Sequence, residues 1–294
     1  MSLIDQPLSA EKFSLVAFDL DGTVLDSVKR TISPRVQHAL QAIRDRGAQT
    51  AVVSGRPLHM LGKTLLTAHW VDWFVTTNGA LILNAHTCKD IFESVMSHTV
   101  MASIFDMLAD LQPAWMLCSE HMSYREKRGV TYLAGQSSSL NTQSPQKIMQ
   151  ILSDVNFVDS LPGALHEISV PIYKIGVSFP SHSRSTEAVK RLKRQGGLEV
   201  FIMSPIELEI TLSGVDKGAA IRHICGVENL DIAHSVAFGD SGNDIAMAGA
   251  VGTFVAMANG TEAVRKAADF ICPPITEDGV ATWLEARMPK AQRG

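Results

Sequence analysis

Short apolar runs alternate with amphipathic stretches near both ends of the chain, and this alternation constrains the fold more than any other feature. FSLVAFD, AQTAVVSG and DWFVTTNGALIL are typical of buried strands, and so are SVAFGD and GTFVAMA nearer the C-terminus. Helical patterns separate these runs. Strands that alternate with helices predict β-α-β units and a mostly parallel sheet. We therefore expect an α/β fold with a Rossmann-like core.

The clearest predicted helix covers SPRVQHALQAIRDRG, residues 33–47. Ser33 can cap this helix, Pro34 suits its first turn, and Gly47 can end it. Further helices are expected at residues 57–69, 242–251 and 261–270 on the same kind of pattern.

The middle of the chain has a different pattern. It holds the strand-like runs YKIGVSF and LEVFIM, the basic helical run TEAVKRLKRQGG, and the Ser/Gln-rich run AGQSSSLNTQSPQK. We expect a smaller α+β domain at residues 85–204. It would be inserted into a discontinuous core formed by residues 1–84 and 205–294.

The composition is that of an ordinary globular protein. The 294 residues are 46% hydrophobic and 19% charged, and the net charge of −4 lacks the basic surplus of a nucleic-acid binder. The four cysteines lie far apart and form no C-x-x-C pair, which favours free thiols in a reducing compartment. The first residues, MSLIDQPLSAEKFS, do not resemble a secretory signal, and no apolar run has the length of a membrane span. These features predict a cytoplasmic protein without a nucleic-acid or membrane partner.

Two acids follow the first predicted strand, in LVAFDLDGTVLDS. Side chains alternate along a strand, so Asp19 and Asp21 can project to the same side of its carboxyl end, where open α/β sheets bind ligands. Taken alone, the pattern is equally typical of a capped turn with two solvated acids. An EF-hand calcium loop is excluded, because Val24 and Arg30 stand where that loop requires Gly and Glu.

Two further motifs suit an anion. Ser54 ends the strand in VVSGRP, and the backbone amides of Gly55 and Arg56 begin the next predicted helix. Lys217 opens the helix in LSGVDKGAAIRHI, where a cation opposes the helix dipole unless an anion lies nearby. Separately, these features are also typical of an ordinary helix cap and a surface lysine.

A third acid ends the strand in SVAFGDSGNDIAMA. Asp240 follows that strand, and Asn243 and Asp244 begin the next helix. An acid at a helix N-terminus is ordinary capping. An acid beside a glycine at the carboxyl end of a strand is less ordinary.

Together, in this order, the motifs resemble those of the haloacid dehalogenase (HAD) superfamily, and specifically its Cof-type phosphatases. The resemblance rests on DLDGT, SGR, TTNGA, DKGAA and GDSGND, with ITEDGVATWLEA similar to the family's C-terminal helix. It covers approximately residues 13–84 and 205–285. The run AMANG at 256–260 departs from the family's usual AMGNA, and the inserted middle resembles the family's cap only in position and length.

The resemblance implies roles for the acids. Asp19 would be the nucleophile that forms an aspartyl-phosphate. Asp21 would protonate the leaving oxygen and then take a proton from the hydrolytic water. Repulsion between neighbouring carboxylates favours keeping one acid of the pair protonated, as a proton donor requires.

The resemblance also implies a Mg²⁺ cofactor, because carboxylates, phosphate oxygens and waters are the ligands that this ion takes. Asp19 and Asp240 would bind it through carboxylates and Asp21 through its backbone carbonyl, while Asn243 and Asp244 would orient metal-bound waters. The implied metal set is Asp19, Asp21, Asp240 and Asp244, and the implied phosphate-binding set is Ser54, Gly55, Arg56, Lys217 and Asn243. Asn78 is a further candidate for contact with phosphate or substrate. In the cap the candidates are Tyr124, Arg125 and Lys174, each of which is also typical of an ordinary structural residue.

The predicted function is that of a Mg²⁺-dependent phosphomonoesterase acting on a small phosphorylated metabolite, such as a sugar phosphate or a phosphorylated cofactor. A phosphomutase or phosphotransferase would use the same intermediate, and a non-catalytic sensor of phosphorylated metabolites is a third alternative. A dehalogenase is disfavoured, because Asp21 and the magnesium acids would have no purpose there.

Overall fold

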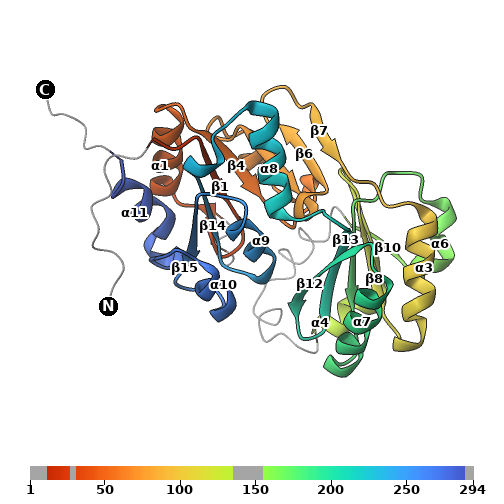
Figure 1. Cartoon of the computed structure of the whole chain (residues 1–294). Helices are drawn as coiled ribbons and strands as arrows, with labels where there is room; N and C mark the ends of the chain where they lie inside the picture. The colour runs from red at the N-terminus through yellow and green to blue at the C-terminus, as the bar shows by residue number, and fades with distance from the viewer. Residues whose placement is uncertain (1–11, 27–30, 135–154, 289–294) are drawn as a thin grey trace, which may run out of the picture. The chain divides into compact units, whose positions relative to one another are not determined.

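The computed structural model describes residues 12–26, 31–134 and 155–288 (Figure 1). The described residues group into two compact units. The first contains the described residues up to 54, residues 63–91 and the described residues from 216 onward, and the second contains residues 55–62, 92–134 and 155–215. Most of the predicted Ser/Gln-rich loop, and most of the N-terminal run without a secretory pattern, lie outside the described residues.

The larger sheet has eight strands in the order β16-β15-β14-β1-β4-β5-β6-β7. All pairings from β16 to β5 are parallel, and β6 runs antiparallel to β5. This confirms the predicted α/β class with a mostly parallel sheet. The strands are β1 (Leu15–Phe18), β4 (Gln49–Val53), β5 (Trp73–Thr76), β6 (Leu81–Asn84), β7 (Asp90–Glu93), β14 (Ser235–Gly239), β15 (Thr253–Met257) and β16 (Phe270–Cys272), with β2 (Leu25–Asp26) and β3 (Thr31–Ile32) pairing separately.

The register of β1 explains how distant motifs meet. Every residue of β1 is buried, as expected for a central strand of a parallel sheet with both faces covered. Phe18 at its end is in register with Val52 of β4 and Phe238 of β14. Because the three strands are parallel, the residues that follow them emerge at one edge of the sheet.

The helix α1 (Pro34–Arg44) confirms the predicted cap, since the Ser33 side chain accepts a hydrogen bond from the Val36 amide at 3.2 Å. It packs against α11, and α8 packs against α9 (Figure 1). The other helices of the first unit are α2 (Lys63–Leu66), α8 (Lys217–Glu228), α9 (Ile245–Ala248), α10 (Glu262–Ala267) and α11 (Gly279–Glu285).

One predicted helix is wrong and two are too long. Residues 57–69 form a 3₁₀ turn at Leu58–Met60 and the short α2, because Gly62 between them has a φ of +86° that no continuous helix allows. Residues 242–251 form a 3₁₀ turn at Gly242–Asp244 before the short α9, and α10 ends before β16 begins.

The second unit is built on a six-stranded sheet in the order β10-β9-β8-β11-β13-β12, whose apolar face carries the unit's core. The predicted runs YKIGVSF, LEVFIM and TEAVKRLKRQGG correspond to β11, β12 and α7. The elements are β8 (Ala114–Cys118), β9 (Ser123–Glu126), β10 (Val155–Val158), β11 (Lys174–Ser178), β12 (Leu198–Ser204), β13 (Glu207–Leu212), α3 (His98–Leu108), α4 (Lys127–Ala134), α6 (Leu161–Ala164) and α7 (His182–Gln195). The domain boundaries expected at residues 84/85 and 204/205 remain a prediction. β13 lies after the second of these boundaries but pairs with β11 and β12 in this sheet.

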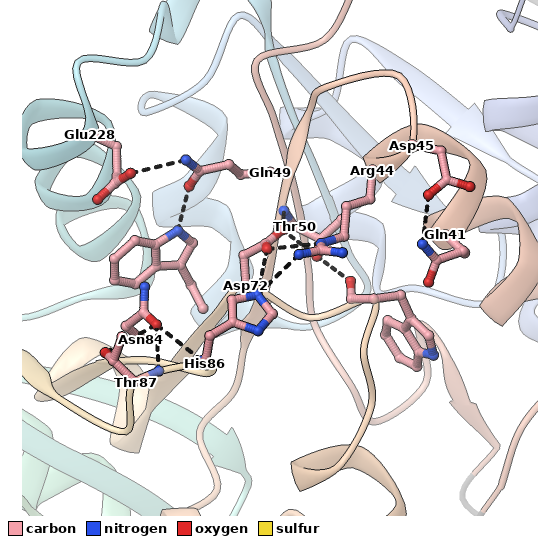
Figure 2. Close-up of polar contacts among 12 residues, drawn as sticks. Gln41, Arg44, Asp45, Gln49, Thr50, Asp72, Asn84, His86, Thr87 and Glu228 are labelled. Atoms are coloured by element: carbon pink, nitrogen blue, oxygen red, sulfur yellow. Dashed lines mark hydrogen bonds and ion pairs between the residues drawn. The ribbon is translucent and has the colours of Figure 1, made fainter.

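A polar network ties the amino ends of β4 and β5 together (Figure 2). The buried carboxylate of Asp72 accepts hydrogen bonds from Arg44 Nε and from the Thr50 amide, both at 2.9 Å, and lies 2.8 Å from His86 Nε2. This network lies at the opposite ends of these strands from the predicted site, so we assign it to the stability of the unit.

Candidate active site

Lys217 joins two of the predicted acids. Its ammonium group lies 2.6 Å from Oδ1 of Asp19 and 2.6 Å from Oδ1 of Asp244, and all three residues are buried. Burial alone lowers the pKa of a lysine, but the charges of the two carboxylates outweigh it, so the pKa of Lys217 is raised and the group stays charged. The two carboxylates are the anions that explain a lysine at the start of α8.

Asp240 completes a cluster of carboxylates. One oxygen from each of Asp19, Asp240 and Asp244 lies within 4.8 Å of the others. Burial first, and then the charge of Asp244, raises the pKa of Asp240 to about 7. Burial likewise raises the pKa of Asp19 well above its usual value, despite the attraction of Lys217.

Two glycines make this crowding possible. A Cβ on Gly22 would lie 2.2 Å from Oδ2 of Asp240, and a Cβ on Gly239 would lie 2.5 Å from the Cβ of Asp244. Gly22 also has a φ of +81°, which places it in the left-handed region. The DGT turn and the end of β14 therefore require glycine because the acids approach closely.

The turn after β14 fixes Asp244. Its Oδ2 accepts hydrogen bonds from the backbone amides of Asp240 and Ser241, each at 2.9 Å, while its Oδ1 receives Lys217. Both oxygens of Asp244 are thus engaged by the protein. Asn243 is buried beside it and donates from Nδ2 to Oδ1 of Asn78 at 3.0 Å.

Asp21 is not a member of the group formed among the described residues by Asp19, Asp240 and Asp244, but its charge contributes to the raised pKa of Asp240. It is partly exposed and forms an isolated bridge with Leu25 beyond the end of β1. The period-two alternation that placed both acids on one side stops at Phe18, where the strand ends.

The anion-binding motif after β4 is divided between the two units. Ser54 is buried at the end of β4, where its amide donates to the Val75 carbonyl at 2.8 Å. Gly55 and Arg56 belong to the second unit. Their proximity to the carboxylates stays a prediction.

Sequence reasoning missed two side chains beside the acids. The Thr23 hydroxyl donates to Oδ1 of Asp240 over 3.5 Å, and the Ser241 hydroxyl donates to Oδ1 of Asn243 at 2.6 Å. Both residues lie in motifs that had been selected because of their acids. A hydroxyl side chain close in sequence to these carboxylates is the signal that could have identified them.

The cap candidates lie in the second unit. The ammonium group of the buried Lys174 bonds to the Glu209 carboxylate and, at 2.6 Å, to the Gly55 carbonyl, so its charge is compensated within that unit. Arg125 lines a hollow of about 360 Å³ together with Glu207, and Tyr124 packs against the unit's core.

The cluster fits a divalent cation. Three carboxylates face a single ammonium group, which leaves an excess of negative charge in a buried place. Burial is the main cause of the raised pKa values of Asp19 and Asp240, and the charges of the neighbouring carboxylates add to it. Carboxylate oxygens at this spacing are the donors that hard divalent cations take.

No helix in the described ranges combines the length and apolar character needed to cross a bilayer.

Comparison with known proteins identifies the family of the chain. The family model of haloacid dehalogenase-like hydrolases matches residues 16–284. The chain is 25% identical over 267 residues to the 5-amino-6-(5-phospho-D-ribitylamino)uracil phosphatase YcsE of Bacillus subtilis (strain 168), covering 91% of this chain and 92% of that protein. It is 25% identical over 277 residues to the pyridoxal phosphate phosphatase YbhA of Escherichia coli (strain K12), covering 93% and 98%.

A solved structure shows the same fold. The HAD subclass IIB sugar phosphatase BT4131 superposes with a TM-score of 0.74 at 21% identity, over 92% of this chain and 98% of that one. The family match spans most of the sequence and includes every strand of the larger sheet except part of β1. The chain therefore belongs to the haloacid dehalogenase-like hydrolases, as a phosphatase of the Cof type.

Proposed function

We propose that the protein is a Mg²⁺-dependent phosphomonoesterase that works through an aspartyl-phosphate. The observation that carries this proposal is the buried carboxylate of Asp19, held by Lys217 next to Asp240 and Asp244. A carboxylate fixed at the carboxyl end of a central strand suits a nucleophile, since ligands of open α/β sheets bind at that edge.

The residues divide the chemistry in two steps. Lys217 engages Oδ1 of Asp19, so we assign Oδ2 to the attack on phosphorus. The new bond joins Oδ2 to phosphorus while the bond from phosphorus to the leaving oxygen breaks, and Asp21 gives that oxygen its proton. Asp21 then takes a proton from water, whose oxygen attacks phosphorus, and phosphate leaves with Asp19 restored.

The metal would be held by the carboxylates of Asp19 and Asp240 and by the backbone carbonyl of Asp21. Bound there, Mg²⁺ would supply the positive charge that lets a carboxylate and a phosphate dianion approach. Both carboxylate oxygens of Asp244 accept hydrogen bonds from protein donors. This supports a role in orienting metal-bound waters, which we propose also for Asn243.

The phosphoryl oxygens would be held by the remaining motif residues. Lys217 offers a charge that is already buried, and the Ser54 hydroxyl stands at the end of the neighbouring strand. The amides near them would stabilise the charge that develops on the phosphoryl group. The proposed set is Ser54, Gly55, Arg56, Lys217 and Asn243.

The proposed substrate class is a small phosphorylated metabolite in the cytoplasm. The similar proteins are named for pyridoxal phosphate, for a phosphorylated ribitylaminouracil and for sugar phosphates, which supports a sugar phosphate or a phosphorylated cofactor. The relatives differ among themselves, so the class is proposed rather than one compound.

The test is phosphate release from sugar phosphates, nucleotides and phosphorylated vitamins, with Mg²⁺ and with EDTA. We expect release that needs the metal and that disappears in the folded Asp19→Asn variant. Substantial phosphate release by that variant would contradict the assignment of Asp19 as the nucleophile. Transfer of the phosphoryl group to an added alcohol, without free phosphate, would instead identify a mutase or transferase. Metal binding without any turnover would identify a sensor.

A further inference from the structure

Three consecutive residues after β5 have left-handed backbones. The φ values are +50° at Thr77, +60° at Asn78 and +102° at Gly79. A β-branched residue such as Thr77 is an outlier in this region, so the turn costs stability, and such cost persists only where the surroundings hold it in place. All three residues are buried.

The turn is bonded to the end of β4. The Ser54 amide donates to the Val75 carbonyl at 2.8 Å, and the Asn78 amide donates to the Ser54 carbonyl at 3.1 Å. These two bonds continue the hydrogen bonding between β4 and β5 past the end of β4. The backbone of Ser54 is therefore fixed on both sides by the segment that leads into Asn78.

The same turn lies against the start of α8. A Cβ on Gly79 would come within 2.5 Å of the carbonyl oxygen of Asp216, the residue that caps α8 just before Lys217. Only a glycine allows this approach, and the left-handed φ at Gly79 has the same requirement.

The side chain of Asn78 reaches the turn after β14. Its Oδ1 accepts from Nδ2 of Asn243 at 3.0 Å, and Oδ1 of Asn243 in turn accepts from the Ser241 hydroxyl at 2.6 Å. Both asparagines are buried, at 0% and 4% exposure, so an amide left without its partner would be desolvated at a cost.

We infer that Asn78 is a positioning residue of the active site: it orients the Asn243 amide through its side chain and the Ser54 backbone through its amide. The inference rests on the proposed function, since Ser54 and Asn243 are proposed there to meet the phosphoryl group. Asn suits the position because it tolerates the left-handed backbone and carries the acceptor that Asn243 needs.

The experiment is a double-mutant cycle on phosphatase activity. Asn78→Gly keeps the left-handed backbone and removes only the side chain, and Asn243→Ala removes the partner. We expect Asn78→Gly to lower kcat about tenfold, as for the loss of one buried hydrogen bond, with a smaller change in KM. If Asn78 acts through Asn243, the double variant should be within about threefold of Asn243→Ala alone, because coupled sites are not additive.

The matched control is Asn229→Gly. Asn229 is the exposed C-terminal cap of α8 and has a φ of +52°. The same Asn-to-Gly change at a left-handed backbone is therefore made away from the acids. We expect wild-type kcat from it. A kcat for Asn78→Gly within twofold of wild type, or a double variant whose loss is the product of the two single losses, would overturn the inference.

Two further results separate the possible failures. An inactive wild-type protein would reject the proposed function before the cycle begins. If Asn78→Gly does not fold, Asn78→Asp replaces it, since its carboxylate oxygen still accepts from Asn243. Retention of most of kcat in Asn78→Asp, with loss in Asn243→Ala, would support the positioning role. Equal loss in both would reject it.

Discussion

Lys217 holds Asp19 and Asp244 with one ammonium group, 2.6 Å from an oxygen of each. The three side chains come from different segments, after β1, at the start of α8 and after β14. Because the whole triad is buried, its charges are weakly screened by solvent, and each depends on the others for compensation. Function and stability are therefore coupled at this point.

Replacing Lys217 with Met should abolish phosphate release and destabilise the fold. The variant leaves two buried carboxylates without their cation, and breaking a buried pair in this way costs about 3–5 kcal/mol. The loss should be largest near pH 8 and shrink toward pH 5, because protonation of Asp19, whose pKa is already raised, removes one of the two uncompensated charges. Urea unfolding at both pH values measures it.

The control for that variant is Lys266→Met. Lys266 pairs with Glu262 on the exposed face of α10, where ion pairs contribute little. It should leave both activity and the pH dependence of unfolding unchanged. Equal stability of Lys217→Met and wild type at pH 8 would contradict the account of the triad.

Asp240→Asn should stabilise the metal-free protein at high pH. The folded-state pKa of Asp240 is raised from 3.8 to about 7, so the folded protein binds a proton that the unfolded chain releases in that interval. The stability contributed by that proton is present below the unfolded pKa and is lost as pH rises through about 7. The amide has no such loss, and we expect a gain on the order of 2 kcal/mol at pH 8 without metal.

Mg²⁺ should reverse the order of the two proteins. The ion would stabilise wild type by mass action and leave Asp240→Asn almost unaffected, because the variant lacks a proposed ligand. Thermal unfolding at pH 5 and pH 8, with Mg²⁺ and with EDTA, separates these effects. Asp90→Asn, at an exposed acid on β7, is the control. A higher midpoint for wild type in EDTA at pH 8 would contradict the prediction.

Much of this site followed from the sequence because its residues follow strands. The alternation of strands and helices predicted a parallel sheet, and parallel strands bring Asp19, Ser54 and Asp240 to one edge whatever their distance along the chain. The lysine at the start of α8 was likewise informative, since its unfavourable position implied an anion.

The remainder depended on turns and on distant contacts. The helix predicted at residues 57–69 is interrupted by a single positive φ at Gly62. The helical spacing of the apolar residues on either side gives no sign of this interruption. The contact between Asn78 and Asn243 joins residues 165 positions apart, and no periodicity encodes it. The side-chain alternation along β1 could not place Asp21, because the strand ends at Phe18, three residues before it.

Gly22→Ala should weaken metal binding. The added methyl group would collide with Oδ2 of Asp240 at 2.2 Å and so displace a proposed ligand. Gly47→Ala is the matched control, because Gly47 has a similar φ of +92° but open space around its Cβ position. Both variants should lose about 1 kcal/mol from the left-handed backbone. Only Gly22→Ala should need more Mg²⁺ for half-maximal activity, and an equal requirement in both would contradict the steric argument.

Thr76→Val should stabilise the protein, whereas Thr50→Val should destabilise it. Both threonines are 0% exposed. The Thr76 hydroxyl has no hydrogen-bond partner among the described residues, while that of Thr50 donates to the Trp70 carbonyl beside Asp72 (Figure 2). Removing an unpaired buried hydroxyl should recover about 1 kcal/mol, and removing a paired one should cost about 1–3 kcal/mol. Urea unfolding measures the change in the free energy of unfolding, and hence its sign, for both variants. A loss of stability in Thr76→Val would mean that its hydroxyl has a partner, such as an ordered water, and a loss of activity at unchanged stability would place that hydroxyl in the active site.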